Sequence, residues 1–148
     1  MKYGARKFNQ HSYDICDAPA KEIISSFLKK RGFDIISTKE DYGVDITCSK
    51  DGKIFLVEVE TKNSTEFTGE YDFPFDTVSF SGRKIRLHKQ EPFWYVIVNL
   101  NTRASIFCHS KQIYKKQYLE EIYILTDKRK GMDAFYRVPK EFCYFITV

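Results

Sequence analysis

Hydrophobic positions between residues 19 and 31 recur at helical spacing, and this pattern predicts the first element of the chain. An acceptor side chain and an early proline, in Asp17-Ala18-Pro19, stand at its start. Three basic residues followed by Gly32 stand at its end, as is typical of a helix C-terminus. We therefore predict one amphipathic helix over Pro19–Arg31. Its apolar stripe is formed by Ile23, Ile24, Phe27 and Leu28.

Several later segments favour strands because they are short, apolar and bounded by turn residues. The Asp51-Gly52 dipeptide predicts a hairpin, and a second hairpin is expected around Asn101. Asn63–Pro74 is polar and predicts a loop, whereas the spacing in Ser110–Glu120 predicts a second helix. The predicted strands are Phe33–Thr38, Val44–Cys48, Lys53–Glu60, Phe93–Asn99, Ala104–Cys108 and Phe142–Val148. This order predicts a mixed α/β or α+β domain, with helices flanking one central mixed sheet.

The composition adds that the chain forms one domain with a real core. It has 148 residues, of which 43% are hydrophobic, and a net charge of +4 that permits a polyanionic partner. The cysteines, Cys16, Cys48, Cys108 and Cys143, form no CxxC pair, which argues against a zinc finger or a thioredoxin-type motif. Met1–Gln10 is polar and basic, unlike a signal peptide, and no stretch has the length of a membrane span. We expect a cytoplasmic protein without a membrane partner.

Acidic residues interrupt the third predicted strand in a pattern that favours metal binding. Side chains alternate between the faces of a strand, so Glu58, Glu60 and Lys62 point one way while Val57 and Val59 point the other. Two neighbouring carboxylates in an apolar strand repel each other, and partial burial raises the cost. A divalent cation compensates this repulsion directly, and Mg²⁺ prefers such hard oxygen ligands.

Asp45 is expected to join these acids. If the strands around Asp51-Gly52 pair as a hairpin, the end of the first strand that carries Asp45 lies near the Glu58–Glu60 end of the second. Three carboxylates then converge, with Lys62 on the same face to orient a water molecule or to stabilise phosphate charge.

These motifs together resemble the PD-(D/E)XK (restriction-endonuclease-like) nuclease superfamily, which includes archaeal Holliday-junction resolvases and many small phage and bacterial nucleases. The resemblance covers residues 18–62 and extends more weakly to residues 83–84 and 93–99. It rests on Leu28-x-x-x-Gly32-Phe33, Gly43-Val44-Asp45-Ile46 and Val57-Glu58-Val59-Glu60. It implies a restriction-endonuclease-like core and a metal-dependent endonuclease that hydrolyses phosphodiester bonds, with Mg²⁺ or Mn²⁺ as cofactor.

The resemblance also assigns roles to individual residues. The aspartate of the family falls on Asp45 and its central glutamate on Glu58. The usual lysine falls on Glu60, which is a departure, and Lys62 is expected to supply the missing cation. Glu22 is the candidate for the acid that many members carry on the preceding helix. Asp45, Glu58 and Glu60 would hold the metal.

Basic residues downstream are candidates for binding nucleic acid. Arg83 and Lys84 lie close to Arg86 and Lys89, which a solvated turn explains equally well. We expect Arg83 and Lys84 to contact phosphates, with salt-sensitive affinity. Either Lys62 or Lys84 is expected to assist the metal-activated water in its attack on phosphorus. The expected partner is nucleic acid, with DNA favoured over RNA by the resemblance, and a homodimer is compatible with the sequence.

Two alternatives stay open at this stage. A non-catalytic module that kept the nuclease fold and binds nucleic acid or a protein is favoured by Glu60 at the position of the usual lysine. An unrelated α+β domain would carry these acids on the solvent side of a strand, paired with neighbouring cations. That second alternative predicts that Asp45 and Glu58 do not converge.

Overall fold

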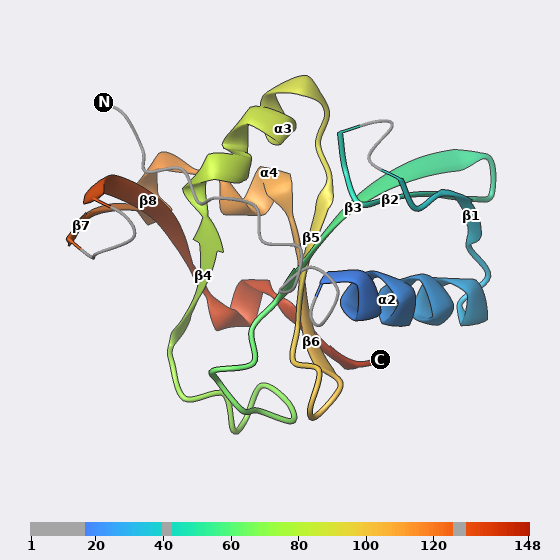
Figure 1. The fold of residues 1–148 in the computed structure, drawn as a ribbon, viewed down its shortest axis with the longest axis horizontal. Helices are drawn as coiled ribbons and strands as arrows, with labels where there is room; N and C mark the ends of the chain where they lie inside the picture. Colours follow the sequence, from blue (N-terminus) through green and yellow to red (C-terminus); the bar gives the residue numbers. More distant parts are fainter. Residues whose placement is uncertain (1–16, 40–42, 126–129) are drawn as a thin grey trace.

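Two β-sheets form the frame of the molecule in the computed structural model, which describes residues 17–39, 43–125 and 130–148. The larger sheet has six strands in the order β1-β2-β3-β5-β6-β9 (Figure 1). Its strands are β1 (Asp34–Ser37), β2 (Ile46–Lys50), β3 (Lys53–Thr61), β5 (Trp94–Val98), β6 (Ala104–His109) and β9 (Tyr144–Thr147). β3 and β5 run parallel, and the other neighbouring pairs are antiparallel.

A three-stranded sheet packs beside the larger one. Its order is β4-β8-β7, with β4 (Thr77–Ser81), β7 (Leu119–Leu125) and β8 (Lys130–Pro139). The helices are α2 (Ala18–Lys30), α3 (Ile85–Gln90) and α4 (Ser110–Ile113), with 3-10 turns η3 (Gly82–Lys84), η4 (Lys116–Tyr118) and η5 (Lys140–Phe142). The mixed α+β class expected from the sequence is confirmed, although two sheets replace the single sheet expected.

α2 covers one face of the larger sheet, as its apolar stripe requires. A proline stands in its first turn, Lys29 and Lys30 in its last, and Gly32 follows it with a φ of +89°, a conformation that suits glycine. Ala20, Ile24 and Leu28 are buried against side chains of the central strands.

The β2–β3 hairpin sets the position of the acidic residues. Asp51 and Gly52 take positive φ values of 52° and 76°, which is the geometry of a tight hairpin turn. The ladder pairs Lys50 with Lys53 and continues to Ile46 opposite Val57. Residues that precede Ile46 therefore lie beside the second half of β3.

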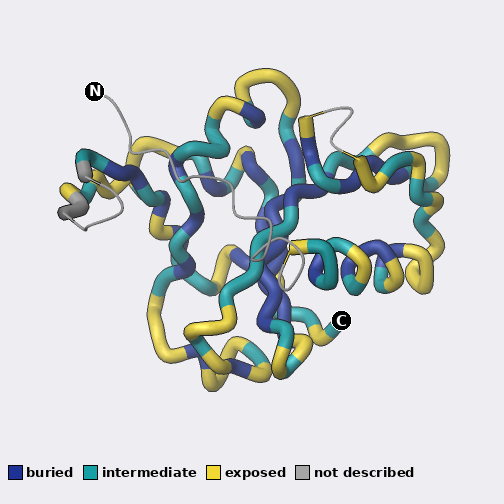
Figure 2. Tube along the Cα trace, viewed as in Figure 1, coloured by how far each residue is buried: buried dark blue, intermediate teal, exposed yellow. Residues whose placement is uncertain are grey.

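The core is divided between the two faces of the larger sheet. On the α2 face, Ile46, Val57, Val96 and Phe107 pack under the helix. On the opposite face, Tyr95 and other side chains of the central strands pack against β4, α3, α4 and β8. Figure 2 shows the buried stretches running through the central strands, with exposed residues at the tip of the β2–β3 hairpin and in the peripheral loops.

The C-terminal half departs most from the sequence expectation. The predicted helix Ser110–Glu120 is wrong, because only residues 110–113 are α-helical and β7 already begins at Leu119. β4, β7 and β8 were not predicted. β7 and β8 form a long antiparallel pair, so partners brought together by the fold, rather than local spacing, decide their conformation.

Candidate functional site

Asp45 and Glu58 meet at the end of the β2–β3 hairpin. The backbone N–H of Asp45 donates a hydrogen bond to Glu58 Oε1 at 3.2 Å, and Asp45 Oδ2 accepts one from the N–H of Val59 at 2.8 Å. The two side chains also share a hydrogen bond. The convergence expected from the hairpin is thus present for these two acids, and the prediction of the unrelated-domain alternative fails.

Glu58 is a buried carboxyl group in a crowded place. Its residue is 8% exposed. Burial is the largest of the effects that raise the pKa of Glu58 from 4.5 to about 8, and the side-chain hydrogen bond to Asp45 adds to it. Lys84, whose Nζ lies 3.7 Å from Glu58 Oε2, acts in the opposite direction. The pair therefore carries less than two negative charges at neutral pH.

Lys84 reaches this carboxylate from the 3-10 turn η3. Its Nζ also lies 4.8 Å from the centre of the Tyr95 ring, a cation–π contact. Ser81 begins the turn, and its side chain accepts a hydrogen bond from the N–H of Arg83. Sequence alone assigned Lys84 to the nucleic-acid surface, whereas the structure directs its ammonium group at the carboxylates.

Glu60 has a separate partner. The hydroxyl of Tyr95 donates to Glu60 Oε2 at 2.6 Å. Tyr95 is fully buried, and it pairs with Glu58 in the parallel β3–β5 register, so its side chain lies on the face that carries the acids. Burial, followed by the charge of Glu60, raises the pKa of the Tyr95 hydroxyl. Tyr95 therefore holds Glu60 as a hydrogen-bonded carboxylate beside the Asp45–Glu58 pair.

Lys62 lies at the end of the same face, beneath β8. Burial lowers the pKa of its ammonium group, while the negative charge of Glu60 raises it and the positive charge of Arg137 lowers it. The charges that act on Lys62 therefore come from Glu60 and from β8. Lys84, rather than Lys62, is the cation in contact with Glu58.

The helix contributes a cation instead of the acid expected. Glu22 is exposed on α2 and lines a polar groove that also contains Arg103. Its neighbour Lys21 places Nζ 3.9 Å from Asp45 Oδ1 and donates to the carbonyl of Thr38 at 2.9 Å. The helical phase that faces the acids falls one residue before Glu22, and this spacing is the signal that could have indicated Lys21.

Arg83 points away from the acids toward β8. Its Nη2 lies 3.7 Å from Asp133 Oδ2, and the side chain of Asp133 is 2% exposed. Gly82 allows this close approach, because a Cβ at that position would stand 2.6 Å from the carbonyl oxygen of Ala134. Arg83 therefore joins η3 to β8.

The carboxylates do not form a three-acid cage. Among residues 17–39, 43–125 and 130–148, no three side chains of His, Cys, Asp or Glu are grouped so that they could hold a metal ion together. Asp45 and Glu58 form a pair of oxygen donors. Glu60 lies on the same face of β3 and is bound to Tyr95.

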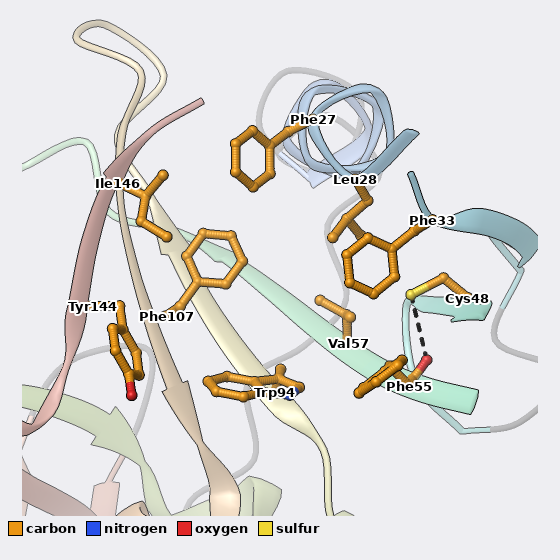
Figure 3. A pocket seen from close by; sticks show the side chains of 10 residues that line it. All are labelled: Phe27, Leu28, Phe33, Cys48, Phe55, Val57, Trp94, Phe107, Tyr144 and Ile146. Carbon is orange, nitrogen blue, oxygen red and sulfur yellow. Dashed lines mark hydrogen bonds between the residues drawn. The ribbon is translucent and has the colours of Figure 1, made fainter. Parts of the chain in front are cut away.

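A large apolar groove lies on the other face of the sheet. Its volume is about 350 Å³, and its lining side chains converge between α2 and the strands (Figure 3). They are Phe27, Leu28, Phe33, Cys48, Phe55, Val57, Trp94, Phe107, Tyr144 and Ile146. The groove contains no acidic or basic side chain, and Val57 and Glu58 point to opposite faces of β3. The groove is therefore separate from the carboxylate site.

Comparison of the chain with protein-family models, with curated proteins and with solved structures gives no match. The helices in the described part of the chain are all too short or too polar to cross a membrane. The site is therefore interpreted from its own geometry and chemistry.

Proposed function

We propose that the protein is a divalent-metal-dependent nuclease that acts on phosphodiester bonds, with Asp45 and Glu58 at the centre of its site. The carrying observation is that the backbone N–H of Asp45 binds Glu58 Oε1 where Glu58 is buried, so that the two acids lie together. Two acids held together in this way are costly unless charge is supplied to them. Perturbed carboxyl groups of this kind are typical of functional sites.

The donor set fits Mg²⁺ or Mn²⁺. Mg²⁺ is usually bound through one or two carboxylates, with water and substrate phosphate completing its shell, so a third acid is not required. Asp45 and Glu58 would hold the ion, with Glu60 nearby on the same face. When bound, a divalent cation supplies charge to the phosphate and lowers the pKa of a bound water.

The protein's own side chains would complete the site. The Lys84 ammonium group, now 3.7 Å from Glu58, would bind a phosphate oxygen and stabilise the charge that develops there. Tyr95 would position Glu60 through its 2.6 Å hydrogen bond. Lys21 would fix the orientation of Asp45 from α2. Of the two lysines that the sequence offered as the assisting cation, Lys62 and Lys84, this arrangement favours Lys84.

The substrate class rests on the resemblance of residues 18–62 to the PD-(D/E)XK superfamily. A helix followed by three antiparallel strands, with the acids on β3 and just before β2, is consistent with that resemblance. DNA is the substrate we propose, and RNA is the alternative that the assay separates. The net charge of +4 is compatible with a polyanionic substrate.

The test compares cleavage and metal-dependent stability in three proteins. Wild type, Glu58→Gln and the exposed control Glu91→Gln are assayed with Mg²⁺ and Mn²⁺ on supercoiled, branched and single-stranded DNA and on RNA. We expect Glu58→Gln to lose at least about 100-fold in cleavage rate, because the carboxylate that would hold the divalent cation is lost, and with it the cation's stabilisation of phosphate charge. Glu91→Gln should match wild type.

Thermal melts of the same proteins test metal binding without turnover. Mn²⁺ should raise the melting temperature of wild type and Glu91→Gln, since a ligand stabilises the state that binds it, and should act weakly on Glu58→Gln. A Glu58→Gln protein that is destabilised without metal and insensitive to Mn²⁺ would contradict the proposal.

A non-catalytic module that binds nucleic acid or a protein partner is the second candidate. The observation that favours it is that Lys84 and Lys21 already compensate the two acids, while Glu60 is bound to Tyr95. This candidate predicts no Mn²⁺-dependent stabilisation and no cleavage of any substrate. Duplex binding by such a module would weaken in Lys84→Ala, with a shallower dependence on salt.

A further inference from the structure

Two thiols face each other at an edge of the larger sheet, away from the carboxylates. The antiparallel register of β6 and β9 pairs Phe107 with Tyr144. One residue further along both strands, the same register places Cys108 opposite Cys143. The backbone of Cys143 is extended, with φ −112° and ψ 157°, so it continues the strand.

The hydrogen-bond pattern identifies what kind of cross-strand pair this is. The N–H of Val148 donates to the carbonyl of Arg103 at 2.9 Å. Hydrogen-bonded and non-hydrogen-bonded pairs alternate along an antiparallel ladder, which puts Cys108 and Cys143 at a non-hydrogen-bonded position. Cα atoms at such a position are about 4.5 Å apart. Disulfides span Cα separations of roughly 4.4–6.8 Å, so a bond here needs little backbone movement.

Both thiols are buried, and their S–H groups donate to nearby backbone carbonyls, Cys108 to Phe142 at 3.8 Å and Cys143 to Pro139 at 3.9 Å. Cys108 is 1% exposed and Cys143 is 8% exposed, and both are free thiols. A hydrogen bond with Cys108, together with burial, raises the pKa of the Cys143 thiol. Cys48 offers an internal comparison, because it is equally buried but belongs to the cluster on the α2 face.

We propose that Cys108 and Cys143 form a reversible modification site, which a low-molecular-weight disulfide oxidises to a cross-strand disulfide and a thiol reduces again. One thiolate attacks the reagent, forms a mixed disulfide and releases one reagent thiol. The second protein thiolate then displaces the other reagent thiol. Two S–H bonds are lost, one S–S bond forms, and the two electrons and two protons leave with the reagent.

The bond would constrain a part of the molecule that matters for the carboxylate site. The segment between the two cysteines contains β7 and β8. β8 supplies Asp133, which binds Arg83, and Arg137, whose charge acts on Lys62. Oxidation would therefore link β6 to the start of β9 and close the segment that carries β7 and β8 into a covalent loop.

The experiment follows the reduced full chain as it refolds from denaturant in a buffer of reduced and oxidised glutathione. Remaining thiols are alkylated, and the products are analysed by intact mass and peptide mapping. Of the four cysteines, wild type should lose two reactive thiols without a glutathione adduct, in a peptide that joins Cys108 to Cys143. Cys48→Ser should also lose two, and Cys143→Ser none. The oxidised wild type should melt at a higher temperature than the reduced protein.

Several outcomes would overturn the proposal. These are alkylation of both Cys108 and Cys143 in the oxidising buffer, a glutathione adduct without the internal bond, or a bridge to Cys48 or Cys16. The peptide map of wild type decides the question even if Cys143→Ser fails to fold. Cys143→Ala provides a second variant that leaves no hydroxyl in the apolar cluster.

Discussion

The two faces of β3 give the sharpest contrast in the molecule. Val57 packs under α2 in a cluster of aliphatic and aromatic side chains, with no charged member. Its neighbour Glu58 is nearly as buried, yet it lies among Asp45 and Lys84 on the opposite face. The same strand thus serves a dry face and a charged face, because successive side chains point in opposite directions.

The difference shows that burial alone does not define a core. On the α2 face, burial of apolar surface stabilises the fold without further requirements. On the other face, the buried acids need partners, and the structure supplies them: Asp45 for Glu58 and Tyr95 for Glu60. A cation that binds the acids on the charged face would relieve their repulsion, whereas the apolar face has no charged group for such a ligand to bind.

Placing a charge on the dry face should have the largest effect. Val57→Asp puts a carboxylate into the apolar cluster, beside a groove whose lining has no acidic or basic side chain, and should lower the free energy of unfolding by more than about 4 kcal/mol. Urea denaturation measures the change. Ile54→Asp on the same strand is the control, because Ile54 is 67% exposed and should cost less than about 1 kcal/mol. Equal losses in both variants would remove the contrast.

Removing the ionisable group of Glu58 from the other face should raise, not lower, the stability of the metal-free protein at high pH. The pKa of Glu58 is about 8 in the folded protein and 4.5 in the reference state, so the folded protein keeps a proton that the unfolded chain releases. Metal-free stability should therefore fall as the pH rises from 4.5 to about 8. The loss should be at most about 5 kcal/mol, since one pKa unit corresponds to about 1.4 kcal/mol.

Glu58→Gln should abolish this part of the pH dependence and be more stable than wild type above pH 8. Chemical denaturation across the pH range measures both effects, and Glu91→Gln should keep the wild-type slope. An unchanged slope in Glu58→Gln would show that another group titrates.

Removing the partner of Glu60 should have a smaller effect. Tyr95→Phe keeps the buried ring but deletes the hydroxyl that donates to Glu60 at 2.6 Å. The free energy of unfolding should fall by about 1.5–3 kcal/mol, as expected for a hydrogen bond to a charged group. Tyr144→Phe is the matched control, because Tyr144 is 61% exposed. Equal stability of Tyr95→Phe and wild type would mean that water replaces the hydroxyl.

The smallest expected effect concerns His88, beyond the charged face on α3. Its Nδ1 lies 2.7 Å from Ser110 Oγ, and burial, with a contribution from Lys111, lowers its pKa from 6.5. A lowered histidine pKa gives stability that is complete above pH 6.5 and is lost as the pH falls below that value. His88→Gln should flatten this acid-side decline by less than about 1 kcal/mol, measured by urea titration at pH 5 and pH 7.

Elements with local signals could be predicted from the sequence. The helix near Pro19–Arg31 and the Asp51-Gly52 hairpin depend on caps, spacing and turn residues that lie within a few positions of one another. β8 could not be predicted in this way, because it contains Gly131 and Pro139 and takes its conformation from pairing with β4 and β7. Its partners are distant in the sequence.

The contacts of the candidate site also differ in whether a local sequence pattern indicates them. The approach of Asp45 to Glu58 follows from the hairpin register and could be predicted. The bond between Tyr95 and Glu60 joins residues 35 positions apart, through a parallel pairing that leaves no local pattern. The contact of Lys84 with Glu58 depends on the packing of η3 against β8, which was equally hidden.

The backbone N–H of Val59 donates a hydrogen bond to Asp45 Oδ2, so this amide reports on ligands that bind the Asp45 carboxylate. In the β2–β3 register Val59 lies opposite Val44, beyond the Ile46–Val57 pair that ends the ladder, so a side-chain oxygen serves there as the acceptor. A cation bound to Asp45 would compete with the Val59 N–H for the carboxylate oxygen and weaken this hydrogen bond. In a nitrogen-labelled chain, the Val59 resonance should therefore move, and its proton should exchange faster, on metal addition alone, which allows occupancy to be followed residue by residue without a substrate.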